Sequence, residues 1–502
     1  MSEDVSIDRP GPANDALVLV RYSGELTTKA RPTRQYFSKR LARNVKNALH
    51  SAGLRSEIER RHDRMHVQLA SRADAHTAAP LIARVFGVQS VAHVEERPWS
   101  TQADLVRHGT ELFGDLVAGK RFAVRARRVG DRRRIRAKSG ELARELGAVL
   151  APRSAGVDLT DPEITTLIEI GPGVAHFFRE ALAGPGGLPL GVEGRAVALV
   201  SGGFDSAVAA WQIQKRGVAL DYVFCNLGGR THQLGTLRVM KQVADDWSYG
   251  TRPHFHAIDF DEVSQDLQRS CTPRYWQIVL KRLMLRAATV VANERGAAAI
   301  ITGEAIGQVS SQTLQNLSVI SQGCEFPILR PLVGMNKDEI LAIARHIGTF
   351  ELSKVVGEYC ALVPSKPATG ARLDAIDSED ERLDASVLER ATAERSIFDL
   401  RALDLATLDD TRLQVEDIPD DATVIDLRTK PAYQTWHYPG ALFLDFGEAM
   451  LAYPSFDRSQ HYVLYCDFGL KSAHLAELMR AEGFEAHSYR HGSASLKKKL
   501  SS

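Results

Sequence analysis

Residues 198–206 read ALVSGGFDS, an apolar run followed by a glycine turn and a polar pair. This order predicts a strand that ends in a tight turn and continues as a helix. Ser201, Gly202 and Gly203 can present backbone N–H groups there, beside the partial positive charge of the helix N-terminus. Ser206 stands at the helix entry, where its hydroxyl can cap the helix or bind phosphate. We predict an anion-binding loop, although a plain tight turn with a helix cap has the same pattern.

The flanking sequence places this loop in a parallel sheet. Strand-like runs alternate with helical stretches, which is typical of a doubly wound α/β fold with helices on both faces. The runs are 196–203 (AVALVSGG), 219–226 (ALDYVFCN), 254–260 (HFHAIDF) and 297–305 (AAAIITGEA). The glycine spacing fits neither the GxxxxGKS loop nor the GxGxxG dinucleotide fingerprint.

The chain as a whole reads as an α/β multidomain protein. Residues 16–75 predict a small α+β module with an amphipathic helix over 34–53. Residues 76–183 predict a second module, with helices over 79–86, 102–116 and 140–150 and a hairpin around 171–173. The remaining expected segments are a disordered N-terminus over 1–15, the doubly wound domain over 184–370, an acidic linker over 371–418 and a small α/β domain over 419–502.

Composition sets broad limits on the class of protein. The 502 residues are 44% hydrophobic and 25% charged, which is ordinary for globular domains and excludes wholesale disorder. No apolar run reaches the length of a membrane span, and the polar N-terminus lacks a signal peptide, so we expect a cytoplasmic protein without a membrane partner. The five cysteines form no CxxC pair, so we expect neither a disulfide framework nor a metal site.

The charges are distributed unevenly. Residues 1–140 hold 27 Lys and Arg against 15 Asp and Glu, while residues 374–421 hold 16 acidic against 5 basic side chains. The densest basic stretch, 120–138, has ten basic residues and one acid. It predicts a polyanion partner whose phosphates these side chains contact, with a solvated arginine face as the alternative.

The loop motif resembles a known superfamily. SGGFDS is similar to the SGGxDS motif of the PP-loop ATP pyrophosphatases, which have the adenine nucleotide α-hydrolase-like fold. Residues 225–229, 280–282 and above all 302–313 (TGEAIGQVSSQT) resemble the tRNA 4-thiouridine synthase family, tRNA uridine 4-sulfurtransferases that are also linked to thiamine biosynthesis. The resemblance implies that Asp205 is a key carboxylate near the reacting phosphates or a metal. It also implies an ATP site made by Leu199, Val200, Ser201, Gly202, Gly203, Ser206, Phe224, Cys225, Lys281, Gly303 and Gln312.

The C-terminal domain resembles the rhodanese fold. Residues 424–428 (VIDLR) and 437–441 (HYPGA) precede a loop, CDFGLKS, that begins at Cys466 and leads into a helix. A cysteine between a strand and a helix N-terminus has its thiolate stabilised by backbone N–H groups, and such a nest also suits a persulfide. Asp467 opposes thiolate formation and Lys471 offsets it. The alternative is a packed core cysteine.

Residues 357–360 (GEYC) resemble the PEYC motif of the same family, with Gly357 in place of proline. The resemblance implies that Cys360 forms a transient, redox-active disulfide with Cys466. Cys466 would carry the sulfane sulfur, and Cys360 would attack Cys466 to release the thiolated product. A thiol reductant must then reset the pair.

Residues 157–163 (VDLTDPE) resemble a segment of THUMP domains, RNA-binding modules of tRNA-modifying enzymes, and residues 25–29 resemble the family's ferredoxin-like domain. Few aromatics lie among the arginines, which favours recognition of folded RNA by its shape and backbone. The expected tRNA contacts are Lys120, Arg121, Arg125, Arg127, Arg128, Arg132, Arg133, Arg134, Arg136 and Lys138.

Together these resemblances imply an ATP-dependent transfer of persulfide sulfur to C4 of a tRNA uridine, expected at position eight. ATP with Mg²⁺ would adenylate the uridine oxygen. A cysteine desulfurase is the implied sulfur donor, and a small carrier protein could take the same sulfur to thiamine thiazole synthesis. Two alternatives stay open: another PP-loop tRNA thiolase, and a non-enzymatic RNA-binding sulfur carrier.

Overall fold

The computed structural model describes residues 16–356, 366–405, 408 and 413–500, without the side chains of Arg132 and Leu470. The described residues form two compact units, one within 1–192 and 215–217 and the other within 193–214 and 218–502. Among the described residues, no helix is both long and apolar enough to cross a membrane.

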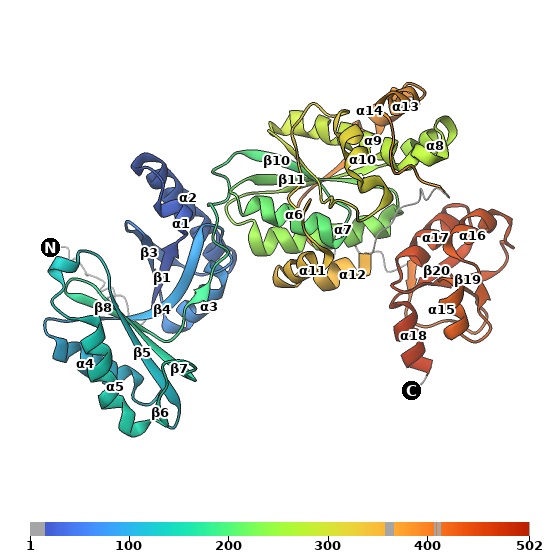
Figure 1. The fold of residues 1–502 in the computed structure, drawn as a ribbon. Coiled ribbons are helices and arrows are strands. Elements are labelled where there is room, and N and C mark those ends of the chain that lie inside the picture. Colours follow the sequence, from blue (N-terminus) through green and yellow to red (C-terminus); the bar gives the residue numbers. More distant parts are fainter. Residues whose placement is uncertain (1–15, 357–365, 406–407, 409–412, 501–502) are drawn as a thin grey trace, which may run out of the picture. The chain divides into compact units, whose positions relative to one another are not determined.

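The first unit is built on one continuous sheet (Figure 1). Its strands run in the order β2-β3-β1-β4-β8-β7-β5-β6, with β9 paired to β4. The strands are β1 (Leu17–Tyr22), β2 (Ser56–Arg60), β3 (Arg64–Leu69), β4 (Val88–Pro98), β5 (Arg121–Arg128), β6 (Gly156–Val157), β7 (Ile164–Ile170), β8 (Val174–Phe178) and β9 (Leu182–Ala183). The helices are α1 (Gly24–Thr27), α2 (Arg31–Ser51), α3 (Arg72–Ile82), α4 (Gln102–Phe113) and α5 (Ser139–Leu150), with 3₁₀ turns η1 (Arg132–Arg134) and η2 (Ala151–Arg153).

The long strand β4 belongs to both modules of this unit. Its first half pairs with β1 and its second half with β8, so the α+β module and the next module share one sheet. The expected hairpin around residues 171–173 is present as β7 and β8. The third helix differs from its expected position over 79–86, because Ser71 caps it by accepting a hydrogen bond from the Asp74 N–H group. The helix therefore begins earlier and continues through Pro80.

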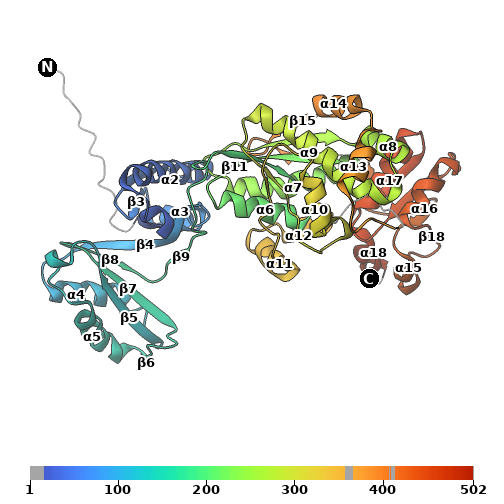
Figure 2. The same cartoon turned by 45° about the horizontal axis from the view of Figure 1, so that its top comes forward.

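The second unit begins with the expected doubly wound parallel sheet, in the order β14-β13-β10-β11-β12-β15. Its elements are β10 (Arg195–Leu199), α6 (Phe204–Gln214), β11 (Ala219–Asn226), α7 (Gly229–Trp247), β12 (His254–Asp259), α8 (Asp261–Ser270), η3 (Pro273–Tyr275), α9 (Trp276–Arg295), β13 (Ile300–Ile301), η4 (Ser310–Gln312), α10 (Leu314–Ser321), β14 (Ile328–Leu329), α11 (Lys337–His346), α12 (Phe350–Val356), α13 (Leu373–Asp380), α14 (Ala385–Ala393) and β15 (Ser396–Asp399). Helices α6 and α7 lie on one side of the sheet and α9 on the other (Figures 1 and 2). Every residue of β11 is buried, as expected for a central strand covered on both faces.

The segment expected to be an acidic linker contributes to this domain. Ile376 of α13 and Val387 of α14 are buried in the same hydrophobic cluster as the residues of α9. Arg282 on α9 forms ion pairs with Asp377 and Asp380, so part of the acidic composition serves packing. Strand β15 then pairs antiparallel with β12.

The C-terminal part of the second unit is a smaller parallel sheet, in the order β16-β20-β19-β17-β18. Its elements are β16 (Gln414–Val415), β17 (Thr423–Asp426), α15 (Lys430–Thr435), β18 (Leu442–Phe443), α16 (Phe446–Ala452), η7 (Tyr453–Ser455), β19 (His461–Tyr465), α17 (Leu470–Ala481), β20 (Glu485–Tyr489) and α18 (Gly492–Leu500). The central strand β19 ends immediately before Cys466, as the sequence predicts.

Candidate active site

The glycine-rich loop connects β10 to the N-terminus of α6. The Ser206 hydroxyl accepts a hydrogen bond from the Ser201 N–H group (3.3 Å) and donates one to the Gly203 carbonyl (3.2 Å). Gly202 has φ +77°, and a Cβ there would lie 2.6 Å from Oγ1 of Thr236. Glycine is therefore required at this position, and Ser206 holds the loop closed around the helix N-terminus, where an anion is favoured.

One pocket gathers the predicted nucleotide residues at the carboxyl ends of β10 and β11, where doubly wound folds bind ligands. Gly303 lies against the loop so closely that a Cβ would be 2.8 Å from the Asp205 carbonyl carbon. Of the predicted residues, Gly202 alone is absent from the lining. Those present are Leu199, Val200, Ser201, Gly203, Asp205, Ser206, Phe224, Cys225, Lys281, Gly303 and Gln312.

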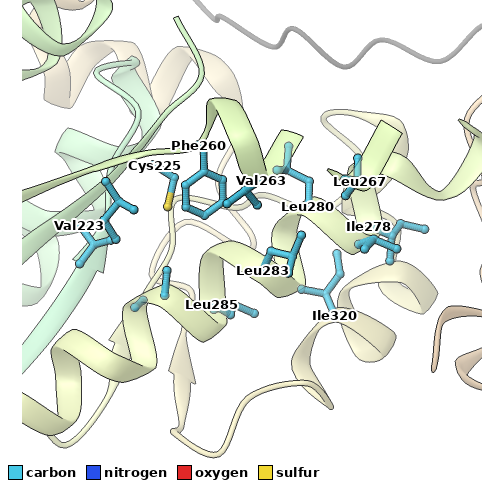
Figure 3. Close-up of a cluster of buried hydrophobic side chains, with 14 of the residues drawn as sticks. Val223, Cys225, Phe260, Val263, Leu267, Ile278, Leu280, Leu283, Leu285 and Ile320 are labelled. Carbon is cyan, nitrogen blue, oxygen red and sulfur yellow. The ribbon is translucent and has the colours of Figure 1, made fainter. Parts of the chain in front are cut away.

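One wall of this pocket is apolar. Met284, Leu285 and Ile320 join Leu199 and Phe224 in the lining, which suits the flat face of a purine. The Cys225 sulfur lies among Val223, Phe260 and other hydrophobic side chains (Figure 3). Burial raises the pKa of the Cys225 thiol, so this cysteine packs as a hydrophobic group and does not present a thiolate.

A buried carboxylate organises the cationic side of the pocket. Glu304 accepts hydrogen bonds from Nζ of Lys281 (2.7 Å), Nε of Arg330 (2.7 Å) and Oγ1 of Thr302 (3.1 Å). Burial alone would raise the pKa of Glu304, but Lys281 and Arg330 hold it below its usual value. Lys281 and Arg330 share this one carboxylate, so the group of three side chains carries a net positive charge.

Asp205 also lines the pocket, in the first turn of α6. Its carboxylate accepts hydrogen bonds from Nζ of Lys337 (3.0 and 3.2 Å) and from Nε2 of Gln308 (2.9 Å). Lys337, the first residue of α11, was missed from the sequence, because no motif marks it and only the fold brings it to Asp205. Gln308 and Glu304 stand within the TGEAIGQVSSQT motif, which was the available signal for both.

His232 was also missed. Its Nε2 donates to the Ser201 carbonyl (3.2 Å), and its ring packs edge-on against Phe224 with centroids 4.9 Å apart. Burial lowers the pKa of His232 to about 4, so the ring is neutral at pH 7. The hydrogen bond from His232 therefore connects α7 to the glycine-rich loop.

Cys466 occupies a second site, at the end of β19. Its side chain is 5% exposed, and its Sγ accepts a hydrogen bond from the Gly469 N–H group (3.2 Å) and lies 3.5 Å from Oγ of Ser472. Gly469 has φ +84° and caps α17, so the sulfur faces a helix N-terminus. These donors stabilise negative charge on a thiolate or persulfide.

The rhodanese-like motif residues support this loop without touching the sulfur. Arg428 donates to both carboxylate oxygens of Asp426, and the Tyr465 hydroxyl donates to Oδ2 of Asp426 (2.6 Å). The same hydroxyl accepts the N–H group of Tyr438 (3.0 Å), so the motif ties the 437–441 turn to the end of β19. Asp467 accepts from Ser493, and Nζ of Lys471 lies 5.6 Å from the Phe446 ring centroid.

Cys360, the predicted partner of Cys466, lies outside the described residues. Within them, Cys225, Cys271, Cys324 and Cys466 are free thiols. The pairing of Cys360 with Cys466 therefore stays a prediction.

The predicted RNA-binding residues divide into two groups. Arg121 pairs with Asp158 (2.6 Å), Arg125 donates to the Leu159 carbonyl (3.1 Å), and Arg127 donates to Glu169 (2.8 Å). The second group extends into solvent, although Arg133 also lies near Asp131 and Lys138 pairs with Glu141. Its members are Lys120, Arg133, Arg134, Arg136 and Lys138, while Arg128 is half-buried and the side chain of Arg132 lies outside the described residues.

Comparisons with known proteins match the chain in three places. Residues 191–385 match the family described as thiamine biosynthesis protein (ThiI), residues 17–92 the ThiI ferredoxin-like domain and residues 409–499 the rhodanese-like domain. A tRNA sulfurtransferase of Pyrobaculum aerophilum is 37% identical over 94% of this chain and 96% of its own length. One of Marinobacter nauticus is 32% identical over 93% and 97%. A solved 4-thiouridine synthetase–RNA complex with bound ATP has a TM-score of 0.65 and 28% identity, covering 76% of this chain and 98% of that one.

Proposed function

The chain belongs to the ThiI family of tRNA sulfurtransferases, and from this premise we propose that it converts a tRNA uridine, expected at position eight, to 4-thiouridine. The observation that carries the proposal is the pocket around the SGGFDS loop, which holds a helix N-terminus, an apolar wall and the ammonium group of Lys281, paired with the buried carboxylate of Glu304. That set suits ATP, and the similar 4-thiouridine synthetase structure has ATP and RNA bound.

Adenylation comes first in the proposed sequence. O4 of the uridine attacks the α-phosphate of ATP, and pyrophosphate leaves. The oxygen on C4 is then bonded to AMP, which is a much better leaving group from C4 than the free oxygen. The α6 N-terminus, Lys281 and Lys337 bind the phosphates and stabilise the charge that develops on them. Mg²⁺ fits here, because it is commonly held by one carboxylate and substrate phosphates, and Asp205 offers that carboxylate.

Sulfur transfer follows from the Cys466 nest. The terminal sulfur of a Cys466 persulfide attacks C4 and AMP leaves, which forms a C4–S–S–Cys466 adduct. The Cys360 thiolate then attacks Sγ of Cys466, so that sulfur stays on C4 and a Cys360–Cys466 disulfide forms. A thiol reductant returns two electrons, and a cysteine desulfurase recharges Cys466.

One contact joins the helices that follow the two sites within the second unit. The N–H group of Arg230, at the start of α7, donates to Oε2 of Glu477 on α17 (2.9 Å). Helix α17 follows Cys466, and α7 carries His232, which donates a hydrogen bond to the glycine-rich loop.

The same persulfide would serve thiamine thiazole synthesis through a small carrier protein, a role that requires Cys466 but not Asp205.

A reconstituted assay tests the proposal. Purified protein, an unmodified tRNA transcript, ATP, Mg²⁺, cysteine, a cysteine desulfurase and a thiol reductant should yield pyrophosphate and 4-thiouridine by nucleoside mass spectrometry. Asp205→Ala should lose both products and retain persulfide on Cys466. Appearance of 2-thiouridine would indicate another PP-loop thiolase, and persulfide without pyrophosphate in the wild type would indicate a sulfur carrier.

A further inference from the structure

A cluster of two buried histidines and one partly exposed glutamate in the first unit is used by none of this chemistry. His66 on β3, Glu96 on β4 and His176 on β8 each place one ligand atom within 4.8 Å of the other two. Glu96 and His176 are direct cross-strand partners, and Nε2 of His176 lies 3.1 Å from Oε2 of Glu96. The His66 and His176 rings meet edge to face, with centroids 5.2 Å apart.

The hydrogen bond between His176 and Glu96 gives these two side chains a polar partner, but it gives none to His66. His66 is 5% exposed, and its Nε2 has no hydrogen-bond partner among the described residues. A buried ring nitrogen without a partner forfeits the hydrogen bond that water would supply. A neutral imidazole has a lone pair on one ring nitrogen, so a cation between the three side chains would satisfy His66.

Glu96 contributes a carboxylate, which offers a cation a charged oxygen ligand beside the two imidazoles. The nearby Arg61 charge is offset by Glu59, which accepts two hydrogen bonds from it at 3.1 Å.

From this geometry we propose that His66, Glu96 and His176 bind one Zn²⁺. Two imidazoles and one carboxylate are a zinc donor set, whereas Mg²⁺ and Ca²⁺ prefer oxygen ligands alone. Ligands of a tetrahedral zinc lie about 3.4 Å apart, so the most widely separated of these ligand atoms, which lie within 4.8 Å of one another, approach by at most about 1.4 Å on binding. Glu96 is 38% exposed, which leaves the fourth position to water.

The position of the cluster indicates what the ion does. Strand β3 belongs to the α+β module, and β4 runs through both modules. Strand β8 pairs with the second half of β4, which carries Glu96, in the module that carries the basic stretch. Zinc would cross-link both halves of the shared sheet and stabilise the first unit.

Zinc titration of the full chain tests the proposal. Cysteines are first alkylated with iodoacetamide, because thiolates also bind zinc, and bound metal is removed with a chelator. The wild type should bind about one equivalent of Zn²⁺, and zinc should raise its midpoint of thermal unfolding. His66→Gln and Glu96→Gln should each weaken the affinity at least ~10-fold and abolish the thermal shift.

The matched control is His76→Gln, at a histidine pair in the same unit. The His76 and His93 rings lie 4.6 Å apart, and within the described residues no third ligand joins them. This variant should bind zinc as the wild type does. Should the wild type and Glu96→Gln bind zinc equally, or should the wild type bind none, the site does not exist. Glu96 is partly exposed, so Glu96→Gln remains informative even if His66→Gln fails to fold.

Discussion

Nζ of Lys337 lies 3.0 Å from Oδ1 and 3.2 Å from Oδ2 of Asp205, which stands 132 positions earlier in the chain. Lys337 is the first residue of α11, where the helix dipole disfavours a cation. The same ammonium group lies 5.6 Å from the Phe204 ring centroid. The ion pair thus holds a cation beside the first turn of α6, next to the glycine-rich loop; under the proposed function, the phosphates of ATP would share this cation with Asp205.

Lys337→Ala should therefore slow thiolation while leaving persulfide chemistry intact. Loss of one preorganised cation that stabilises the transition state costs about 10²–10³ in kcat. The measurements are 4-thiouridine formation under single-turnover conditions and persulfide content of Cys466. Lys354→Ala, at an exposed lysine of α12, is the control and should retain full activity. Normal thiolation by Lys337→Ala would show that Lys337 serves only to anchor α11.

The sequence predicts most of the residues that line the pocket because they stand in contiguous motifs. The loop at 198–206 and the stretch 302–313 each encode a local turn whose glycines have a steric cause, as Gly202 and Gly303 show. Lys337 and His232 are different, since each depends on how a later helix packs against the loop. No local pattern of residues records that packing.

Charge patterns predict less than motifs do. The basic stretch 120–138 suggests a phosphate-binding surface. In the structure, however, Arg121 forms an ion pair with Asp158, and Arg127 forms one with Glu169. The acidic stretch suggests a partly helical linker, but Ile376 on α13 and Val387 on α14 are buried in the core of the doubly wound domain. In both segments the fold supplies counter-charges and apolar partners from distant residues, which composition cannot reveal.

The division of the arginines leads to a prediction for RNA binding. Replacing Arg133, Arg134 and Arg136 together by Ala should weaken tRNA binding. It should also lower the slope of log Kd against log salt by roughly 2, because the loss of three phosphate contacts reduces the number of counterions released on binding. Filter binding over a range of salt concentrations measures the slope. The control Arg390→Ala, at an exposed arginine of α14, should leave it unchanged. An unchanged slope in the triple variant would place these arginines away from the RNA.

The buried carboxylate of Glu304 predicts a pH-dependent stability. Glu304→Gln should lower the free energy of unfolding of the doubly wound domain by about 3–5 kcal/mol, because Lys281 and Arg330 lose their shared counter-ion. The folded pKa of Glu304 lies below the usual 4.5, so its contribution is present above pH ~4.5 and disappears as the pH falls through the folded value.

Urea unfolding from pH 7 to pH 3 measures this effect. The difference between wild type and Glu304→Gln should be constant near neutrality and shrink below pH ~4.5. Glu294→Gln is the control, since Glu294 is exposed at the end of α9 and pairs with Arg395. A difference that grew on acidification would mean that Glu304 is protonated in the folded protein, contrary to the two cations beside it.

The two-thiol sequence predicts different failures for its two cysteines. Cys466→Ala should abolish both persulfide and thiolation, because within the described residues Cys466 is the thiol that faces the N–H group of a glycine cap. Cys360→Ala should still carry persulfide on Cys466 but stop after forming the C4–S–S adduct. Cys271→Ala is the control, since burial raises the pKa of that thiol to about 12 and leaves it inert.

After turnover without reductant, tryptic mapping of the wild type should find Cys360 joined to Cys466. The two cysteines are 106 positions apart, and a disulfide tolerates at most about 7 Å between Cα atoms. The bond therefore requires the segment at 357–365 to reach the loop after β19 during each cycle. A disulfide from Cys466 to Cys225, Cys271 or Cys324 would remove Cys360 from its assigned role. Equal multiple-turnover thiolation by wild type and Cys360→Ala would instead show that an external thiol releases the product.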